Sequence, residues 1–263
     1  MNTNRRIPIG DYGLIGDTRT AALVAGDGSI DWMCLPRFDS APVFGRLVGG
    51  EEGGCFAIGP DEPGTVVGRR YRGDTTTLET TWAVDGGRIT LADSMVGEVS
   101  ERMLPDSMLV RRITSQGRAI RTRVEINPRF GYKQRSARRV RRQDGSLVID
   151  HGDIALAVSS DAAVELTPDR PAVLEVTPDR PVTVVMSAAY RGPLLLVPPL
   201  VAAEQAERDE TRWQRWADTL ITGPHHRSAM VRSLITIQLL TYSPSGAPVA
   251  APTTSLPETV GGG

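Results

Sequence analysis

TLETTWAVDGGRITLADSM, residues 77–95, places two strand-like runs on either side of the turn Asp85-Gly86-Gly87. Threonine, tryptophan, valine and isoleucine favour extended backbone, and glycine in the turn supplies the positive φ that a tight hairpin needs. The segments 21–25 and 30–35 flank a similar Gly-Asp-Gly-Ser turn. Both patterns predict β-hairpins, and therefore antiparallel sheets.

Four further segments are predicted strands: 107–114, 119–126, 146–150 and 153–160. The second of them alternates, with charged residues on one face and Ile120, Thr122, Val124 and Ile126 on the other. This alternation is typical of an antiparallel strand that is buried on one side. Short strands at regular spacing, separated by turns, predict a β-sandwich rather than βαβ units.

A short repeat follows these strands. TPDRPAVLEV (167–176) is followed directly by TPDRPVTVVM (177–186), and each copy begins with a Pro-Asp turn and ends in β-branched residues. Two copies are too few for a solenoid. The pattern predicts a local ladder of strand, turn and strand.

The character of the chain changes after Pro198 and Pro199. Residues 201–220 predict a helix, because acidic residues lie early in the segment and arginines late, which complements the helix dipole. A second helix is predicted over 225–242. It carries two adjacent apolar rows, which are Met230, Leu234, Ile237 and Val231, Ile235, Leu239. A surface this wide requires burial on more than one side.

Composition limits the classes of function. The 263 residues carry a net charge of −1, so no global field attracts nucleic acid or an acidic membrane, and neither is an expected partner. The N-terminus has no signal-peptide pattern, and no apolar run approaches the roughly 18 residues of a membrane span. We therefore expect a cytoplasmic protein, with Cys34 and Cys55 reduced and in or near the core.

Two polar features invite functional interpretations. The segment 133–143 holds a dense basic cluster, which is typical either of phosphate or nucleic-acid binding or of a strand and turn with a solvated face. We favour the second, since aromatic residues do not interleave it. His225 and His226 are adjacent and diverge on a helix, so we predict no metal site and no cofactor.

Both ends of the chain resemble one family. IGDYGLIGDTRTAALVAGDGSIDWMCLPRFDSAPVFGRLVG (9–49) is similar to the opening of bacterial family-15 glycoside hydrolases, in particular the trehalase-like and glucoamylase-like branches. RSLITIQLLTYSPSGAPVAAPTTSLPE (232–258) resembles the entry into their catalytic barrel. The resemblance implies a mainly β chain. An antiparallel β-supersandwich (1–199) would be followed by a helical linker (200–223) and the start of an (α/α)6 barrel (224–263), truncated before the catalytic part.

The same resemblance implies the chemistry. In the complete enzyme, two carboxyl groups about 6.5–9.5 Å apart would hydrolyse an α-glucosidic bond, in trehalose or a related α-glucoside, with inversion. The family's two glutamates would follow residue 263, so we expect no catalytic residue here and no activity of this chain alone. The alternative is a stand-alone β-sandwich module that binds carbohydrate or helps a separate barrel to fold.

Candidate site residues lie at both ends. Arg37, Phe38 and Asp39 offer a charge, a ring face and a carboxylate, which suits contact with an α-glucoside. The competing interpretation is a folded turn with Phe38 inside and the other two paired. Thr253, Thr254 and Glu258 are predicted to belong to a loop at the barrel mouth, and for Glu258 we favour a loop cap or an ion-pair partner over a catalytic role.

Without the rest of a barrel, the helix predicted over 225–242 has only one face that can dock on the sandwich or on the preceding helix. Large aliphatic side chains left in water each forgo roughly 1.5–3 kcal/mol. An apolar patch of this kind favours association. We therefore expect self-association through 225–242, or mobility of the segment from residue 225 onward.

Overall fold

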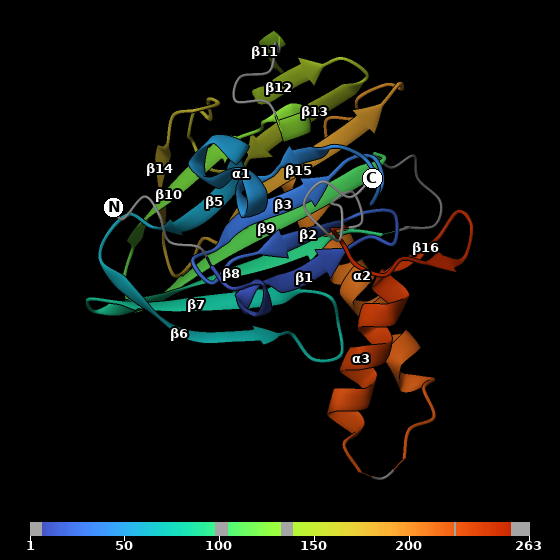
Figure 1. The fold of residues 1–263 in the computed structure, drawn as a ribbon. Helices are drawn as coiled ribbons and strands as arrows, with labels where there is room; N and C mark the ends of the chain where they lie inside the picture. Colours follow the sequence, from blue (N-terminus) through green and yellow to red (C-terminus); the bar gives the residue numbers. More distant parts are fainter. Residues whose placement is uncertain (1–6, 98–104, 133–138, 224, 254–263) are drawn as a thin grey trace.

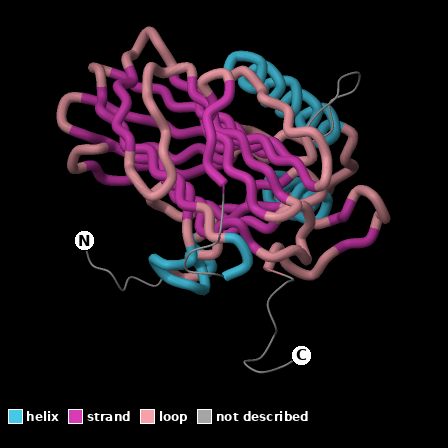
Figure 2. The backbone as a smooth tube through the Cα atoms, turned by 90° about the horizontal axis from the view of Figure 1, so that it is seen from above, coloured by secondary structure: helices cyan, strands magenta, loops and turns pink. Residues whose placement is uncertain are grey.

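The computed structural model describes residues 7–97, 105–132, 139–223 and 225–253. Two antiparallel β-sheets pack face to face, which confirms the predicted sandwich (Figure 1). Figure 2 shows the strands of both sheets in the middle of the molecule, with the helices at its margin.

One sheet, called sheet A, has seven strands in the order β1-β2-β3-β5-β10-β14, with β4 paired to β3. Its strands are β1 (Gly13–Gly16), β2 (Ala21–Val24), β3 (Ser29–Cys34), β4 (Pro42–Phe44), β5 (Cys55–Pro60), β10 (Ile120–Asn127) and β14 (Ala172–Val176). Its short helical turns are η1 (Ile9–Asp11), α1 (Arg46–Gly49), η2 (Gly50–Gly53) and η3 (Phe130–Tyr132).

Sheet B has eight strands in the order β11-β12-β13-β15-β9-β8-β7-β6. They are β6 (Gly64–Tyr71), β7 (Leu78–Val84), β8 (Gly87–Met95), β9 (Ser107–Gln116), β11 (Arg139–Gln143), β12 (Ser146–His151), β13 (Ile154–Ser160) and β15 (Val182–Tyr190). Every predicted strand is therefore present, with its ends shifted by no more than about two residues.

Both predicted hairpins form. Strands β7 and β8 pair up to Val84 opposite Gly87, and Gly86 in the turn has a φ of 66°. Strands β2 and β3 pair around Gly28, whose φ is 79°. A side chain at Gly28 would place its Cβ 2.2 Å from the carbonyl oxygen of Ile58, so this position requires glycine for space as well as conformation.

The core lies between the sheets. In β10 the residues Ile120, Thr122, Val124 and Ile126 are all buried, as their alternation predicts. A charged pair of two neighbouring strands of sheet B lies within this core: Arg111 and Asp93 are fully buried, and their Nε–Oδ1 distance is 2.8 Å. Arg111 also donates to the carbonyl oxygens of Phe56 and Gly28, so one side chain of sheet B ties together two segments of sheet A.

The prediction of a local ladder for the TPDRP repeat is wrong. The first copy leads into β14, which pairs with β10 in sheet A, whereas the second leads into β15, between β13 and β9 in sheet B. Each TPDR segment closes a turn, with bridges between Thr167 and Arg170 and between Thr177 and Arg180. The repeated turn thus carries the chain from one sheet to the other.

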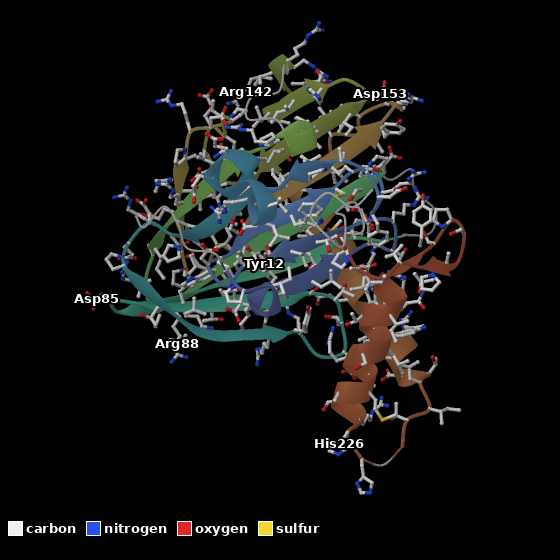
Figure 3. The ribbon with its side chains drawn as sticks, in the orientation of Figure 1. Tyr12, Asp85, Arg88, Arg142, Asp153 and His226 are labelled. Atoms are coloured by element: carbon white, nitrogen blue, oxygen red, sulfur yellow. The ribbon has the colours of Figure 1, made fainter. Side chains whose placement is uncertain are left out.

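Two long helices follow the strands. Helix α2 (Pro199–Asp218) begins with Pro199 in its first turn, and α3 (Arg227–Leu239) runs beside it. Both predicted helices are present, but their bounds differ from the predicted ranges 201–220 and 225–242. We call the pair the helical hairpin; Figure 3 shows His226 at its tip, where the two helices are joined.

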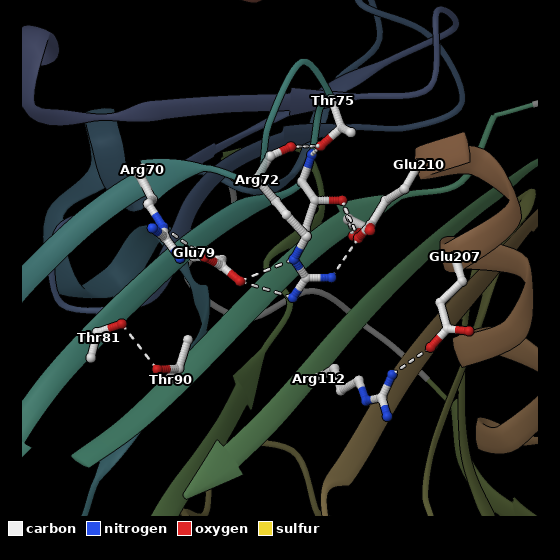
Figure 4. A network of polar contacts seen from close by, with 11 residues as sticks. Arg70, Arg72, Thr75, Glu79, Thr81, Thr90, Arg112, Glu207 and Glu210 are labelled. Atoms are coloured by element: carbon white, nitrogen blue, oxygen red, sulfur yellow. Dashed lines mark hydrogen bonds and ion pairs between the residues drawn. The ribbon is translucent and has the colours of Figure 1, made fainter. Parts of the chain in front are cut away.

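Helix α2 packs on the outer face of sheet B. Its Ala202 and Ala206 contact a small apolar cluster of β9 and β15 residues. Ion pairs reinforce the contact, because Glu210 accepts from Arg72 at 2.8 Å and Glu207 accepts from Arg112 at 2.7 Å (Figure 4).

Helix α3 buries one face only. Val231, Ile235 and Leu239 pack against Trp213 of α2 and its neighbours, while Met230 and Ile237 remain 41% and 57% exposed. The expectation that only one face docks is confirmed. The helix is also held to sheet B by Arg232, which lies 4.0 Å above the ring of Tyr71 and donates to the carbonyl oxygen of Thr75 at 2.8 Å.

After α3 the chain returns to sheet A. Strands β16 (Thr241–Tyr242) and β17 (Ala247–Pro248) form a short hairpin. The amide of Ser243 donates to the carbonyl oxygen of Thr18 at 2.9 Å, and the indole of Trp32 donates to that of Pro252 at 3.0 Å. In the described part of the chain, no helix is both long and apolar enough to cross a membrane.

The basic segment 133–143 is described from residue 139. Residues 139–143 form β11, an exposed edge strand of sheet B. Arg141 pairs with Asp150 at 3.2 Å and Arg142 with Glu165 at 3.0 Å. These acidic partners offset part of the positive charge, which agrees with a solvated strand face; residues 133–138 lie outside the described residues.

Candidate functional site

A groove of about 560 Å³ lies at one end of the sandwich, where loops of both sheets meet the β16–β17 hairpin. It combines apolar walls with charged and aromatic side chains. Its lining residues are Arg19, Leu35, Pro36, Arg37, Ser40, Ala41, Asp106, Ile154, Tyr190 and Tyr242. They come from the β1–β2 turn, the β3–β4 loop, the beginnings of β9 and β13, the end of β15, and β16.

The β3–β4 loop presents Arg37 to the groove. The guanidinium of Arg37 donates two parallel hydrogen bonds to the carboxylate of Asp39, at 2.9 and 3.0 Å. The loop closes on itself, since the Arg37 amide donates to the Ser40 hydroxyl and the Ser40 amide to the Arg37 carbonyl. The hydrogen bonds and charge of Asp39 raise the pKa of Arg37, so the fork stays cationic and oriented.

The two other residues predicted in this loop occupy different places. Phe38 is only 2% exposed and packs edge to face against Tyr242, with ring centroids 6.5 Å apart. It therefore supports the groove from behind and is not one of its lining residues. Asp39 holds Arg37. The structure thus has the folded turn of the competing interpretation, and its Arg37 also lines the groove; contact of these residues with substrate stays a prediction.

Sequence reasoning missed the tyrosines and the acid of the groove. Tyr190 ends β15, and its backbone amide donates to the Asp106 carboxylate at 2.6 Å. Arg191 lies 5.2 Å from the Tyr190 ring centroid and pairs with Asp153 at 2.8 Å. No local motif marks these residues, because they meet only through the pairing of β15 with β13 and β9.

Asp17 fixes the turn that carries Arg19. It is buried and accepts hydrogen bonds from the amides of Arg19 and Thr20, at 2.9 and 2.8 Å, and from the hydroxyl of Ser107 at 2.8 Å. Burial raises the pKa of this carboxyl. Asp17 therefore joins the β1–β2 turn to the start of β9, beside Asp106.

The predicted loop at the barrel mouth is only partly described. Thr253 is half-buried and follows Pro252, the acceptor of the Trp32 indole. Thr254 and Glu258 lie outside the described residues. The role of all three at a barrel mouth stays a prediction.

The buried carboxylates of the described residues serve as structural anchors. Asp31 accepts hydrogen bonds from Tyr12, Ser29 and Arg46, at 2.9, 2.6 and 2.8 Å. Asp209 accepts from Arg212 at 2.8 and 3.1 Å, much as Asp93 does from Arg111. Carboxylates held in this way orient and stabilise the fold, and nothing about them marks a pair that acts across a scissile bond.

The described residues show neither a cluster that suits a metal ion nor an activated thiol. Within residues 7–97, 105–132, 139–223 and 225–253, no three His, Cys, Asp or Glu side chains gather in a way that suits a metal ion. Cys34 and Cys55 are both buried, as predicted, and they form no disulfide bond. Burial raises the pKa of Cys55 to about 11, so its thiol is a poor nucleophile near neutral pH.

The fold is an antiparallel β-sandwich domain with a helical extension and a polar, aromatic groove at one end. The chain belongs to the trehalase-like N-terminal domain family, whose model matches residues 1–188. The family predicted from the two terminal motifs is therefore confirmed.

Curated relatives agree with this family. The trehalase of Thermoplasma volcanium is 29% identical over 257 residues, covering 95% of this chain and 40% of that protein. The trehalase of Mycolicibacterium smegmatis is 28% identical over 280 residues (96% and 41%), and trehalase 1 of Sulfolobus acidocaldarius is 31% identical over 254 (95% and 40%). The chain spans about 40% of the length of these relatives. Among solved structures, a putative kojibiose phosphorylase from the human microbiome matches 89% of this chain and 31% of its own, with a TM-score of 0.35 and 9% identity.

Proposed function

We propose that this chain is the N-terminal portion of a glycoside hydrolase that cleaves α-glucosidic bonds, in trehalose or a related α-glucoside, by an inverting mechanism. The observation that carries the proposal is the family match over residues 1–188, together with trehalases that align with about 95% of the chain. Those relatives are named for trehalose hydrolysis, and this chain accounts for about 40% of their length.

In this proposal the sandwich supplies scaffold and substrate contacts, and the catalytic carboxyl pair lies elsewhere in the enzyme. An inverting enzyme needs one protonated acid and one base about 6.5–9.5 Å apart, with room for water between them. Asp31, Asp93 and Asp209 are instead each bonded to an arginine. We therefore expect the chain alone to hydrolyse no α-glucoside.

A glucose-release assay with the purified chain tests this expectation, with trehalose, maltose and isomaltose as substrates. The expected result is no glucose above that of a mock purification. Turnover that co-purifies with the chain and disappears in Glu258→Gln would overturn it, because a contaminating hydrolase is indifferent to that substitution.

A chimera tests the positive side of the proposal. This chain replaces the aligned 41% of the Mycolicibacterium smegmatis trehalase, and trehalose hydrolysis is compared with that of the remaining segment alone. The expected result is a gain in activity from the added sandwich. Equal activity of the two proteins would contradict a role as the N-terminal portion of such an enzyme.

A second candidate function is a stand-alone module that binds carbohydrate or supports a separately encoded barrel. The observation in its favour is the closed packing of the chain, in which α2, α3 and residues 243–252 all contact the sandwich. Mixing this chain with the remaining segment of the trehalase as a separate polypeptide discriminates the two. Activity restored in trans favours the module, and activity only in the fusion favours the enzyme portion.

We also propose two properties of the chain that concern its surroundings. Its two buried cysteines form no disulfide bond, which fits the reducing conditions of the cytoplasm, the location that we propose. The exposed Met230 and Ile237 support self-association through the outer face of α3, within the segment 225–242.

A further inference from the structure

We propose that the groove at the end of the sandwich binds a neutral α-linked glucose disaccharide directly, between Tyr190 and Tyr242, with hydroxyl contacts from Arg19, Ser40 and Asp106. The identity of the sugar rests on the proposed function. Binding itself is a property of this chain and requires no catalytic group.

The size of the groove fits such a ligand. Its volume of about 560 Å³ lies within the roughly 300–1,000 Å³ that is usual for small-molecule sites. Such sites combine apolar and aromatic walls with a few oriented polar groups. Leu35, Pro36 and Ile154 supply the apolar wall, and the loop around Arg37 supplies an oriented polar one.

The two tyrosines give the groove aromatic surfaces. Tyr242 is held by the edge of Phe38 at a centroid distance of 6.5 Å, so its orientation is set by the core. Tyr190 is 39% exposed, and Arg191 flanks its ring. Arg37, Tyr190 and Tyr242 all line the same groove. A ring face with a polar tip complements a sugar, which has C–H faces and hydroxyl edges.

Polar side chains are among the residues that line this space. Within the described residues, the Arg19 guanidinium, the hydroxyls of Tyr190 and Tyr242 and the Oδ1 atom of Asp106 have no hydrogen-bond partner in the protein. The guanidinium can only donate, the carboxylate oxygen can only accept, and each tyrosine hydroxyl can do both. A polyhydroxylated ligand can satisfy all of them, because each sugar hydroxyl donates and accepts.

The charge balance selects a neutral ligand. Arg19 and Arg37 are matched by Asp106 and Asp39, and at the rim Arg191 is matched by Asp153. An anion such as phosphate would meet the carboxylate of Asp106 and an Arg37 whose fork is already occupied by Asp39. A cation would meet the guanidinium of Arg19. A neutral sugar avoids both electrostatic costs.

Saturation-transfer NMR on the full chain tests the proposal, with trehalose and maltose as the probes and cellobiose as the β-linked control. We expect transfer to the α-linked sugars and a loss of affinity of at least about tenfold in Tyr190→Ala and in Asp106→Asn. The matched control is Arg88→Ala, since Arg88 is an exposed residue far from Asp153 at the other end of the molecule (Figure 3). Circular dichroism confirms that each variant keeps the β-sheet spectrum.

The outcomes separate this inference from the proposed function. Loss of transfer in the groove variants, with binding kept in Arg88→Ala, supports the site. No transfer to the wild-type chain, equal transfer in Tyr190→Ala, equal binding of cellobiose, or displacement of trehalose by inorganic phosphate overturns it. An active chimera without sugar binding by the chain would disprove the sugar site in the groove and leave the proposed function intact. An inactive chimera, with sugar binding by the chain intact, would contradict the proposed function and leave the sugar site supported.

Discussion

The sandwich and the helical hairpin are stabilised in different ways. The sandwich buries a core drawn from both sheets, and within it Arg111 binds Asp93 while donating to two carbonyls of the opposite sheet. The helical hairpin is centred on a much smaller apolar cluster: Trp213, Ala217, Val231, Ile235 and Leu239. Part of its attachment is polar and only partly buried, through Arg72, Arg112 and Arg232.

The two regions of this single chain should therefore differ in stability. The sandwich meets its own needs, whereas α3 depends on α2 and on the edge of sheet B near Tyr71. Local opening free energies follow the number of buried apolar contacts, so the helical hairpin should open before the sandwich does.

Breaking the buried ion pair should have the largest effect. Arg111→Met leaves the carboxylate of Asp93 buried without its partner, which costs about 3–5 kcal/mol of the free energy of unfolding. Urea denaturation measures the loss. The double variant Arg111→Met, Asp93→Leu should recover much of it, because both buried charges are then gone. A loss below about 1 kcal/mol in the single variant would show that the pair does not hold the sandwich together.

Truncating the inner face of α3 should cost less and act locally. Ile235→Ala removes a fully buried side chain, and we expect a loss toward the lower end of about 2–5 kcal/mol, because the small cluster can collapse around the cavity. Hydrogen exchange should accelerate over 228–239 while β9 and β15 stay protected. The matched control is Ile237→Ala on the exposed side. Equal acceleration in the sandwich would mean that the two regions unfold as one.

The ion pairs around Arg72, which also binds Glu210 of α2, should contribute less to the free energy of unfolding. Glu79 lies between Arg70 and Arg72, with oxygen–nitrogen distances of 3.0 and 2.9 Å (Figure 4). Burial acts to raise the pKa of Glu79, but hydrogen bonds from both arginines and their charges lower it overall, below its ordinary 4.5. A lowered folded-state pKa adds stability above the ordinary value, and this stability is lost as the pH falls through the folded-state pKa.

Glu79→Gln should therefore cost up to about 1 kcal/mol at neutral pH, since Arg70 is largely exposed and Arg72 partly exposed. The difference from wild type should shrink as the pH is lowered below 4.5, as followed by urea midpoints. A difference that grows on acidification would contradict a lowered pKa of Glu79 in the folded state.

The outer face of α3 should matter least for folding. Met230→Ser and Ile237→Ser change exposed side chains, so the free energy of unfolding should move by no more than about 0.5 kcal/mol. Sedimentation velocity should nevertheless show a shift toward monomer relative to wild type. A wild-type chain that is monomeric at every concentration would remove the proposed self-association.

Much of the sandwich follows from local patterns. Alternation in 119–126 and the glycine turns at Gly28 and Gly86 are local signals, and β10 and both hairpins form as predicted. The TPDRP repeat failed because pairing partners are set by sheet topology, which adjacent copies of a turn do not encode. In the same way, sequence spacing carries no information that Asp93 and Arg111 pair across strands within the core.

The candidate site was predictable only in part. The β3–β4 loop was identified, since a Pro, an Arg, an aromatic residue and an Asp-Ser pair mark a polar turn. The roles within it were not predicted, because the ring of Phe38 packs against that of Tyr242, more than two hundred residues away in the sequence. Tyr190, Asp106 and Arg19 meet at the groove through long-range strand pairing and through the anchor at Asp17, neither of which has a local signature.

The most direct test of the account is a single NMR sample of the wild-type chain with trehalose, followed over hours. If the sandwich holds an α-glucoside in its groove and lacks the catalytic pair, saturation transfer to the trehalose protons is present from the start and the anomeric signals of free glucose never appear. Glucose that accumulates with time and is absent in Glu258→Gln, or a complete lack of transfer to trehalose, would contradict the account.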